Sequence, residues 1–111
     1  MNKDLEKTHK NLLQVHASLF KRAKKATTRE EFQALTNEMQ EVLHRVNVLQ
    51  RQLFVQSTAA ITQRVEALAQ IEASVKQKIK EAESTQKLLQ DLTRYLAKVD
   101  EIIDLAKSLA A

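Results

Sequence analysis

The sequence predicts an all-α fold, an antiparallel helical bundle or coiled coil of three to four long helices. Three observations support this prediction. The 111 residues contain no Gly and no Pro, the residues that supply most of the turns in a sheet protein. Ala, Leu, Gln, Lys and Glu, all strong helix formers, dominate the composition. Apolar residues recur at spacings of three, four and seven, which is the period of a helix face.

The first helix is expected over residues 4–26, and the second is expected to begin near Arg29. The basic run Lys21–Lys25 favours a helix end, because cations stabilise the negative end of a helix dipole. Thr28 and Glu31 then form a capping box, which marks a helix start. The apolar stripe of the first helix consists of Leu5, Leu12, Leu19, Phe20 and Ala23.

The second helix is expected over residues 29–56. Its apolar residues alternate at spacings of three and four, so they form a heptad seam. The members of this seam are Phe32, Leu35, Met39, Val42, Val46, Leu49 and Leu53.

The remaining chain is expected to be helical over residues 58–110, with an apolar residue at every seventh position. Between Leu53 and Ile61 the register slips by one, which indicates a break near Ser57–Thr58 or a stutter in one long helix. The sequence also allows a second break near Ser84–Thr85, where the neighbouring apolar residues change side. The series runs Ile61, Leu68, Val75, Ala82, Leu89, Leu96, Ile103 and Ala110.

Two architectures fit this pattern. One is a compact four-helix bundle forming a single domain over residues 1–111. The other is a helical hairpin whose very long arm dimerises. An unbroken helix over residues 58–110 would be about 80 Å long at ~1.5 Å per residue, far longer than a small bundle needs. We therefore favour the compact bundle.

Composition also limits the class of protein. There is no Cys, so disulfides and thiolate metal sites are excluded. No apolar stretch approaches the ~20 residues of a membrane-spanning helix, and no signal-peptide core is present. We expect a cytoplasmic protein. The net charge of +4 is too small to indicate nucleic-acid binding by itself.

We find no motif for catalysis, a cofactor or a metal ion, and we expect a non-enzyme. His9 and His16 fall inside the first apolar stripe, but seven residues span roughly 10 Å of helix, too far to share one ion. We interpret them as polar residues of a seam. Arg64 and Glu72 also point into an apolar stripe, where they would specify helix pairing.

Apolar residues outside the seams suggest a protein interface. Val48 and Val55 lie opposite the seam of the second helix. A second apolar line runs beside the heptad series near the end of the chain. Either several helices surround this wide face, or it binds a partner. The line consists of Leu88, Tyr95, Ile102 and Leu109.

These features predict a non-enzymatic helical protein–protein interaction module, such as an assembly factor, adaptor, chaperone-like protein or filament subunit. Its expected partner is another helical protein or a second copy of the chain, with a homo-oligomer favoured. The alternative is accessory binding of nucleic acid, another polyanion or an anionic membrane. This alternative relies on a basic cluster of Lys21, Arg22, Lys24, Lys25 and Arg29.

Overall fold

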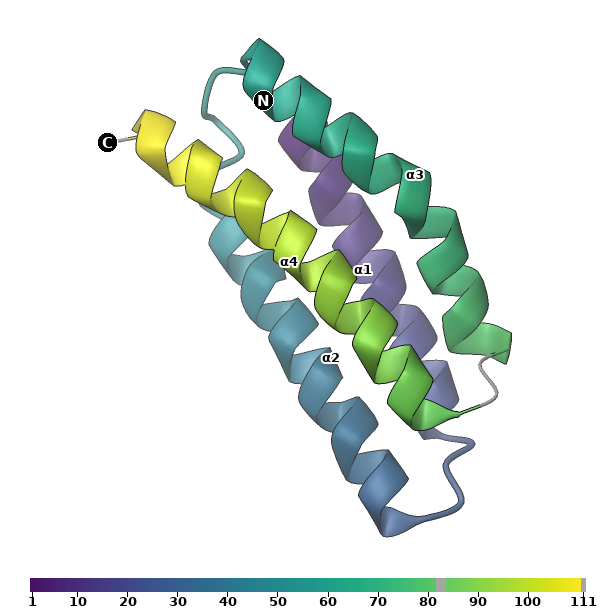
Figure 1. Ribbon diagram of the computed structural model, residues 1–111. Coiled ribbons are helices and arrows are strands. Elements are labelled where there is room, and N and C mark those ends of the chain that lie inside the picture. Colours follow the sequence, from purple (N-terminus) through teal and green to yellow (C-terminus); the bar gives the residue numbers. More distant parts are fainter. Residues whose placement is uncertain (82–83, 111) are drawn as a thin grey trace.

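The computed structural model describes residues 1–81 and 84–110, which fold into four helices that pack against one another (Figure 1). The helices are α1 (Lys3–Ala23), α2 (Arg29–Gln50), α3 (Ala59–Glu81) and α4 (Thr85–Ala110). The predicted all-α class is confirmed. The alternative of one long arm is wrong, because α3 ends at Glu81 and α4 runs back alongside it. Ala82 of the heptad series lies outside the described residues.

Each helix starts with a polar side chain that accepts a hydrogen bond from the backbone N–H three residues further on. Asn2 does so at 3.1 Å, Thr28 at 3.1 Å, Thr58 at 3.3 Å and Ser84 at 3.2 Å. Such a cap satisfies one of the backbone donors that the first helical turn leaves unpaired. Breaks therefore occur at both of the Ser/Thr pairs at which the sequence allowed them.

Helix α2 ends at Gln50, six residues before the expected end at 56. Its last carbonyls are satisfied by short-range turn bonds: the N–H groups of Arg51 and Gln52 donate to the carbonyls of Val48 and Leu49, respectively. Residues 51–58 form the connection to α3. Leu53, expected in the helical seam, lies in this connection and packs partly buried against the core.

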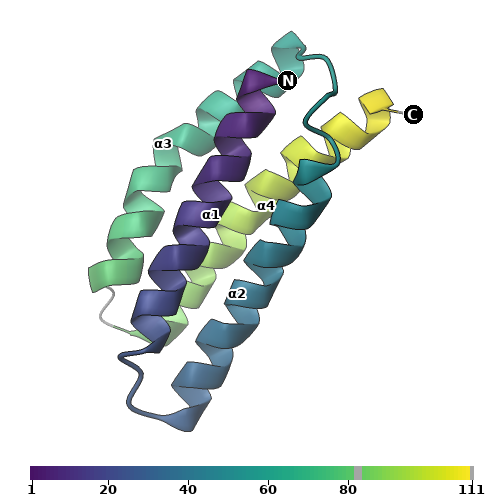
Figure 2. The same ribbon diagram turned by 180° about the vertical axis from the view of Figure 1, so that it is seen from behind.

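The helices form a four-membered ring in which α2 and α3, although consecutive, are not neighbours. Helix α1 packs against α2 and α3, and α4 packs against the same two helices. The connection over residues 51–58 therefore crosses the end of the bundle diagonally. As a result α1 and α3 run parallel side by side, and so do α2 and α4 (Figures 1 and 2).

Four hydrogen bonds join the start of α1 to this diagonal connection and to the first turn of α3. The backbone N–H of Asn2 donates to the carbonyl of Leu53 at 2.7 Å, and its Nδ2 donates to the carbonyl of Val55 at 2.8 Å. Asp4 Oδ2 accepts from Ser57 Oγ at 2.6 Å and from Thr62 Oγ1 at 2.7 Å. These two hydroxyl donors lower the pKa of the Asp4 carboxyl below its usual value. We call this group of contacts the crossover clamp.

The core occupies the centre of the ring and receives side chains from all four helices. The predicted apolar positions are mostly buried: Leu5, Leu12 and Leu19 of the first stripe are fully buried, and so are the heptad positions Leu35, Leu49, Ile61 and Leu68. The prediction fails for Phe20 and Phe32, each about half exposed. The fully buried residues of α4 are Leu88, Leu92, Tyr95, Val99, Ile102 and Ala106.

Two ion pairs tie α4 to its neighbours. Arg45 of α2 donates from Nε and Nη2 to both carboxylate oxygens of Asp100, at 2.7 and 3.0 Å. Lys78 of α3 pairs with Asp91 at 3.1 Å. The bidentate contact between Arg45 and Asp100 constrains both the distance between the two side chains and their relative orientation. It therefore helps to set how α2 and α4 pack against each other.

Replacing Asn2 by Ala tests the crossover clamp. Asn2→Ala removes both the N-cap of α1 and the side-chain bond to Val55, so we expect the free energy of unfolding to fall by about 1 to 2 kcal/mol. Urea denaturation followed by circular dichroism measures this change. Asn47→Ala, at an exposed position inside α2, is the control and should cause no loss. Equal stability of the two variants would show that the Asn2 side chain contributes nothing to stability.

Candidate functional site

The apolar line predicted to bind a partner on α4 belongs mostly to the core. Leu88, Tyr95 and Ile102 are fully buried, so they offer no surface to another protein in this fold. The prediction is wrong for these three residues. Helix α4 packs against both α2 and α3, so it buries two adjacent apolar lines, one against each neighbour. Leu109, near the end of α4, is exposed.

Val48 and Val55 are also less accessible than an interface requires. Both are partly buried and pack against the core. Val55 lies in the crossover connection and not in α2. The prediction that it lies opposite the α2 seam assumed a helical position, which Val55 does not have. The apolar surface available to a partner must therefore be found elsewhere.

Glu72 of α3 is buried, with only 8% of its surface exposed, as the sequence predicted. It lies beside Asn11 of α1, which also accepts a hydrogen bond from Lys76 Nζ at 3.1 Å. Burial raises the pKa of the Glu72 carboxyl, and the charges of Lys76 and Lys7 offset only part of this effect. Arg64 is different: its side chain is exposed and bonds to the Ala60 carbonyl at 3.4 Å, so it does not enter the core.

Tyr95 of α4 lies within the electrostatic reach of Glu72. Burial raises the pKa of the Tyr95 hydroxyl, and the negative charge of Glu72 raises it further. That hydroxyl is fully buried and has no hydrogen-bond partner among the described residues. Tyr95 therefore stays protonated, and together with Glu72 and Asn11 it places polar groups from three helices in one part of the interior.

An exposed apolar surface does exist, on the outer side of the α1–α2 pair. Exposed fractions are 45% for Leu13, 49% for Phe20, 51% for Phe32 and 43% for Leu43. We call these four residues the hairpin face. They are most of the large apolar side chains that are exposed among the described residues; Met1, Phe54 and Leu109 are the others.

Helical periodicity places the four residues on one side of the molecule. On α1, Asn11 marks the side that contacts α3. The buried Leu12 and Leu19 point into the core. At ~100° per residue, Leu13 and Phe20 lie beyond these core positions, on the side away from α3. On α2, Arg45 marks the side that contacts α4, and Phe32 and Leu43 lie away from it. The outer side of the α1–α2 pair is turned toward the reader in Figure 2.

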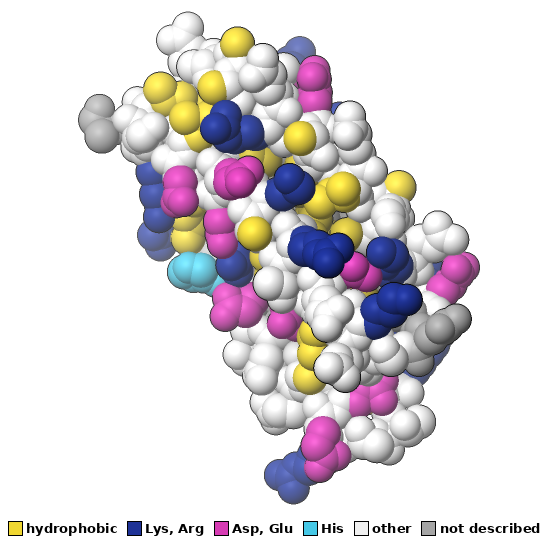
Figure 3. Space-filling view, in the orientation of Figure 1, with side chains coloured by type: hydrophobic (Ala, Val, Ile, Leu, Met, Phe, Trp, Pro, Cys, Tyr) yellow, Lys and Arg dark blue, Asp and Glu magenta, His cyan; other side chains and the backbone are white. Residues whose placement is uncertain are grey.

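The hairpin face also has little charge. Residues 11–20 of α1 include no Lys, Arg, Asp or Glu. The view in Figure 3, centred on α3 and α4, is different, since basic and acidic side chains are interspersed all over it. Sequence reasoning missed the hairpin face, although Leu13 and Phe20 are seven residues apart and directly follow Leu12 and Leu19, which is a sign of a second apolar line.

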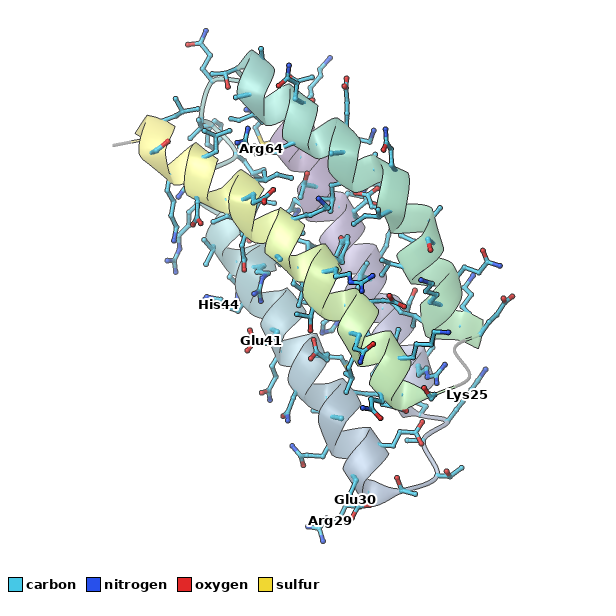
Figure 4. All side chains as sticks on the ribbon, viewed as in Figure 1. Lys25, Arg29, Glu30, Glu41, His44 and Arg64 are labelled. Carbon is cyan, nitrogen blue, oxygen red and sulfur yellow. The ribbon has the colours of Figure 1, made fainter. Side chains whose placement is uncertain are left out.

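The five cations predicted to act as one basic cluster point to three different places. Lys24 Nζ lies 4.5 Å from the centre of the Phe20 ring, in a cation–π contact. Arg29 projects from the tip of α2, away from Lys25 (Figure 4). Lys21, Arg22 and Lys25 stay together beside the end of α3. The cluster is therefore divided, because the chain turns between α1 and α2.

The three cations that remain together line a surface hollow of about 410 Å³. Arg22 Nη1 donates to the carbonyl of Ile79 at 3.0 Å, which joins the end of α1 to the end of α3. Lys80 adds a fourth cation from α3. We call this site the basic hollow. It is lined by Ser18, Lys21, Arg22, Lys25, Glu31, Ile79 and Lys80.

His9 and His16 are half-buried at the edge of the α1 stripe, and His44 is exposed. Nε2 of His9 is buried without a hydrogen-bond partner among the described residues. In the described part of the chain no three His, Asp or Glu side chains come together as metal ligands. The described helices also include none with the length and apolar character needed to cross a membrane.

A comparison of the chain with protein-family models, curated proteins and solved structures finds no match.

Replacing Glu72 by Gln tests the buried carboxyl. Because folding raises its pKa, ionised Glu72 opposes folding above that pKa, and the effect is absent once the group is protonated in both the folded and unfolded states. We expect Glu72→Gln to melt above the wild-type protein at pH 7, and the difference to disappear below about pH 4. Thermal denaturation across this range measures both.

The control for this prediction is Glu66→Gln, at an exposed position of the same helix. It should show no such pH-dependent difference. A Glu72→Gln protein that is less stable than the wild type at pH 7 would mean that the charge of Glu72 supports the fold through its contacts with Asn11 and the nearby lysines.

Proposed function

We propose that this protein is a non-enzymatic helical interaction module that associates with a second copy of itself through the hairpin face. The observation that carries the proposal is the exposure of Leu13, Phe20, Phe32 and Leu43 on the outer side of α1 and α2. Aromatic and large aliphatic side chains in one exposed patch are typical of protein–protein interfaces.

Charge distribution favours a second copy as the occupant. Residues 11–20 of α1 carry no charge, so the centre of the hairpin face brings no like charges together when it meets itself across a two-fold axis. Glu6 and Lys24 are both exposed and lie on the same line of α1, eighteen residues or five helical turns apart. If the α1 helices of two copies pack antiparallel across the axis, each Glu6 meets the Lys24 of the other copy.

The available area fits an interface at the small end of the specific range. An outer face of two helices is about 30 Å long and ~20 Å wide, which gives roughly 600 Å² per copy and ~1,200 Å² in total. Such an interface supports association in the micromolar range rather than an obligate dimer. This suits an adaptor or assembly factor whose partners exchange.

Binding of nucleic acid, another polyanion or an anionic membrane through the whole of Lys21–Arg29 is the weaker candidate. It needs a continuous row of cations that follows a chain of phosphates or a lipid surface. Lys24 is held over Phe20, and Arg29 points away from Lys25, so the cluster does not provide that row.

Introducing charge into the hairpin face tests the proposed function. Leu13→Glu combined with Phe32→Glu places two carboxylates per copy at the centre of the interface. Both positions are about half exposed, so the fold should survive. We expect light scattering to give a dimer mass for the wild-type protein at about 100 µM, and a monomer mass for the double variant with unchanged helicity.

Phe54→Glu is the matched control, because Phe54 is 85% exposed but lies in the crossover connection, outside the hairpin face. It should dimerise like the wild-type protein. A wild-type chain that remains monomeric at millimolar concentration would contradict self-association. A double variant with the dimer mass would move the interface away from the hairpin face.

A further inference from the structure

A line of lysine side chains runs along the side of α1 that lies next to α3. At ~100° per residue, Lys7, Lys10 and Lys21 fall within roughly 60° of one another around the helix axis, and all three are exposed. Residues 7–25 contain no Asp or Glu. On α1 alone this line has a gap, because no residue between Lys10 and Lys21 is a Lys or an Arg.

Helix α3 fills the gap with Lys76. Its Nζ donates a hydrogen bond to Oδ1 of Asn11 at 3.1 Å and another to Oε1 of Gln14. The ammonium group therefore lies against α1 between Lys10 and Lys21. Both acceptors are neutral amide oxygens, so these contacts position the cation without cancelling its charge.

Lys80, one turn further along α3, extends the line to the end of the bundle. It lines the basic hollow together with Lys21 and Lys25. From Lys7 to Lys25 the line is roughly 25 Å long, counting ~1.5 Å per residue of α1. We call these side chains the basic row, which consists of Lys7, Lys10, Lys76, Lys21, Lys80 and Lys25.

Acidic side chains near the basic row leave its lysines available. Glu72 lies close to Lys7 and Lys76, but only 8% of its surface is exposed, so a ligand outside the bundle does not meet it. Glu31 borders the basic hollow and is half-buried, and Glu66 is exposed on α3 ten residues before Lys76. Among the described residues, no lysine of the row forms an ion pair with a carboxylate.

The composition of the basic row favours a chain of phosphates over a protein or a membrane. Lysine is depleted at protein–protein interfaces, where aromatic residues and arginine are enriched. Adsorption to a membrane needs exposed apolar side chains that enter the lipid, but Leu13 and Phe20 lie on the side of α1 away from α3. Phosphates require only point charges in reach, and lysine ammonium groups on flexible stems supply them.

We propose that the basic row binds the phosphate backbone of a single-stranded nucleic acid. A flexible single strand can follow a straight row, whereas the backbone of a duplex winds around its axis once in about 34 Å and would leave the row after a few phosphates. The row includes no aromatic side chain on which bases could stack, so binding should not depend on sequence. The hairpin face lies on the other side of α1, so this binding does not depend on self-association.

The test is fluorescence anisotropy of a labelled oligothymidine of about 12 nucleotides, titrated with the 111-residue chain between about 20 and 200 mM salt. Each phosphate contact of a single strand contributes about −0.7 to the slope of log binding constant against log salt concentration, so the whole row gives a slope of about −4. Lys10→Gln combined with Lys21→Gln removes two contacts. We expect a slope of about −3 and a loss of affinity of roughly tenfold or more at low salt.

The control is Lys98→Gln with Lys107→Gln, which removes the same charge from exposed positions of α4 and should bind as the wild type does. Circular dichroism checks that both double variants keep their helicity. Selective weakening of the Lys10/Lys21 variant, together with the lower salt slope, supports the proposal.

Three outcomes contradict it. Equal weakening of both double variants would mean attraction to the net positive charge alone. Tighter binding of a duplex of the same length, or binding of phosphatidylserine vesicles but not of the oligothymidine, would assign the row to a duplex or to a lipid surface. An unchanged anisotropy at the lowest salt concentration would exclude nucleic-acid binding by the row.

Discussion

The crossover clamp determines how the rest of the bundle is arranged. Hydrogen bonds from Asn2 and Asp4 hold residues 51–58 across the end of the bundle. The diagonal path sets α3 beside α1 instead of beside α2. In a bundle with the same helices and a connection along one edge, α1 and α3 would lie on opposite corners. The polar contacts of this short connection are therefore made in the arrangement in which α1 and α3 are neighbours.

The basic hollow and the hairpin face both depend on this arrangement. Parallel packing of α1 and α3 brings two helix carboxyl ends together, and the bond from Arg22 to the Ile79 carbonyl joins them beside the basic hollow. The pairing of α1 with α2 on the other side leaves Leu13 and Phe20 without a covering helix. Glu72, Asn11 and Tyr95 meet in the interior for the same reason, since they come from three helices that only this arrangement brings together. A buried carboxyl in such a position favours one pairing of helices over another more than it stabilises the fold.

Local signals in the sequence were sufficient for the helices and most of the core. Thr28 caps α2 as its capping-box pattern predicts, and Thr58 and Ser84 cap α3 and α4 at the two breaks that the sequence allows. The predictions about which apolar residues are exposed were less accurate. The sequence predicts Tyr95 and Ile102 on a partner-binding line, but both are core residues. It predicts Phe20 and Phe32 within buried apolar stripes, but both are about half exposed. Periodicity shows that two residues share a helix face, but it does not show how many neighbours cover that face.

By itself, the sequence determined the all-α class, the helix boundary near Thr28 and the burial of most heptad positions, and it allowed breaks near Thr58 and Ser84 without requiring them. These follow from capping, propensity and spacing, which act within a few residues along the chain. The tertiary structure alone decided that α2 and α3 lie on a diagonal, that Lys80 joins Lys21 and Lys25, and that Leu13 and Phe32 share an exposed face. These features depend on contacts between residues far apart in sequence, and such contacts are set by which helices pack against each other.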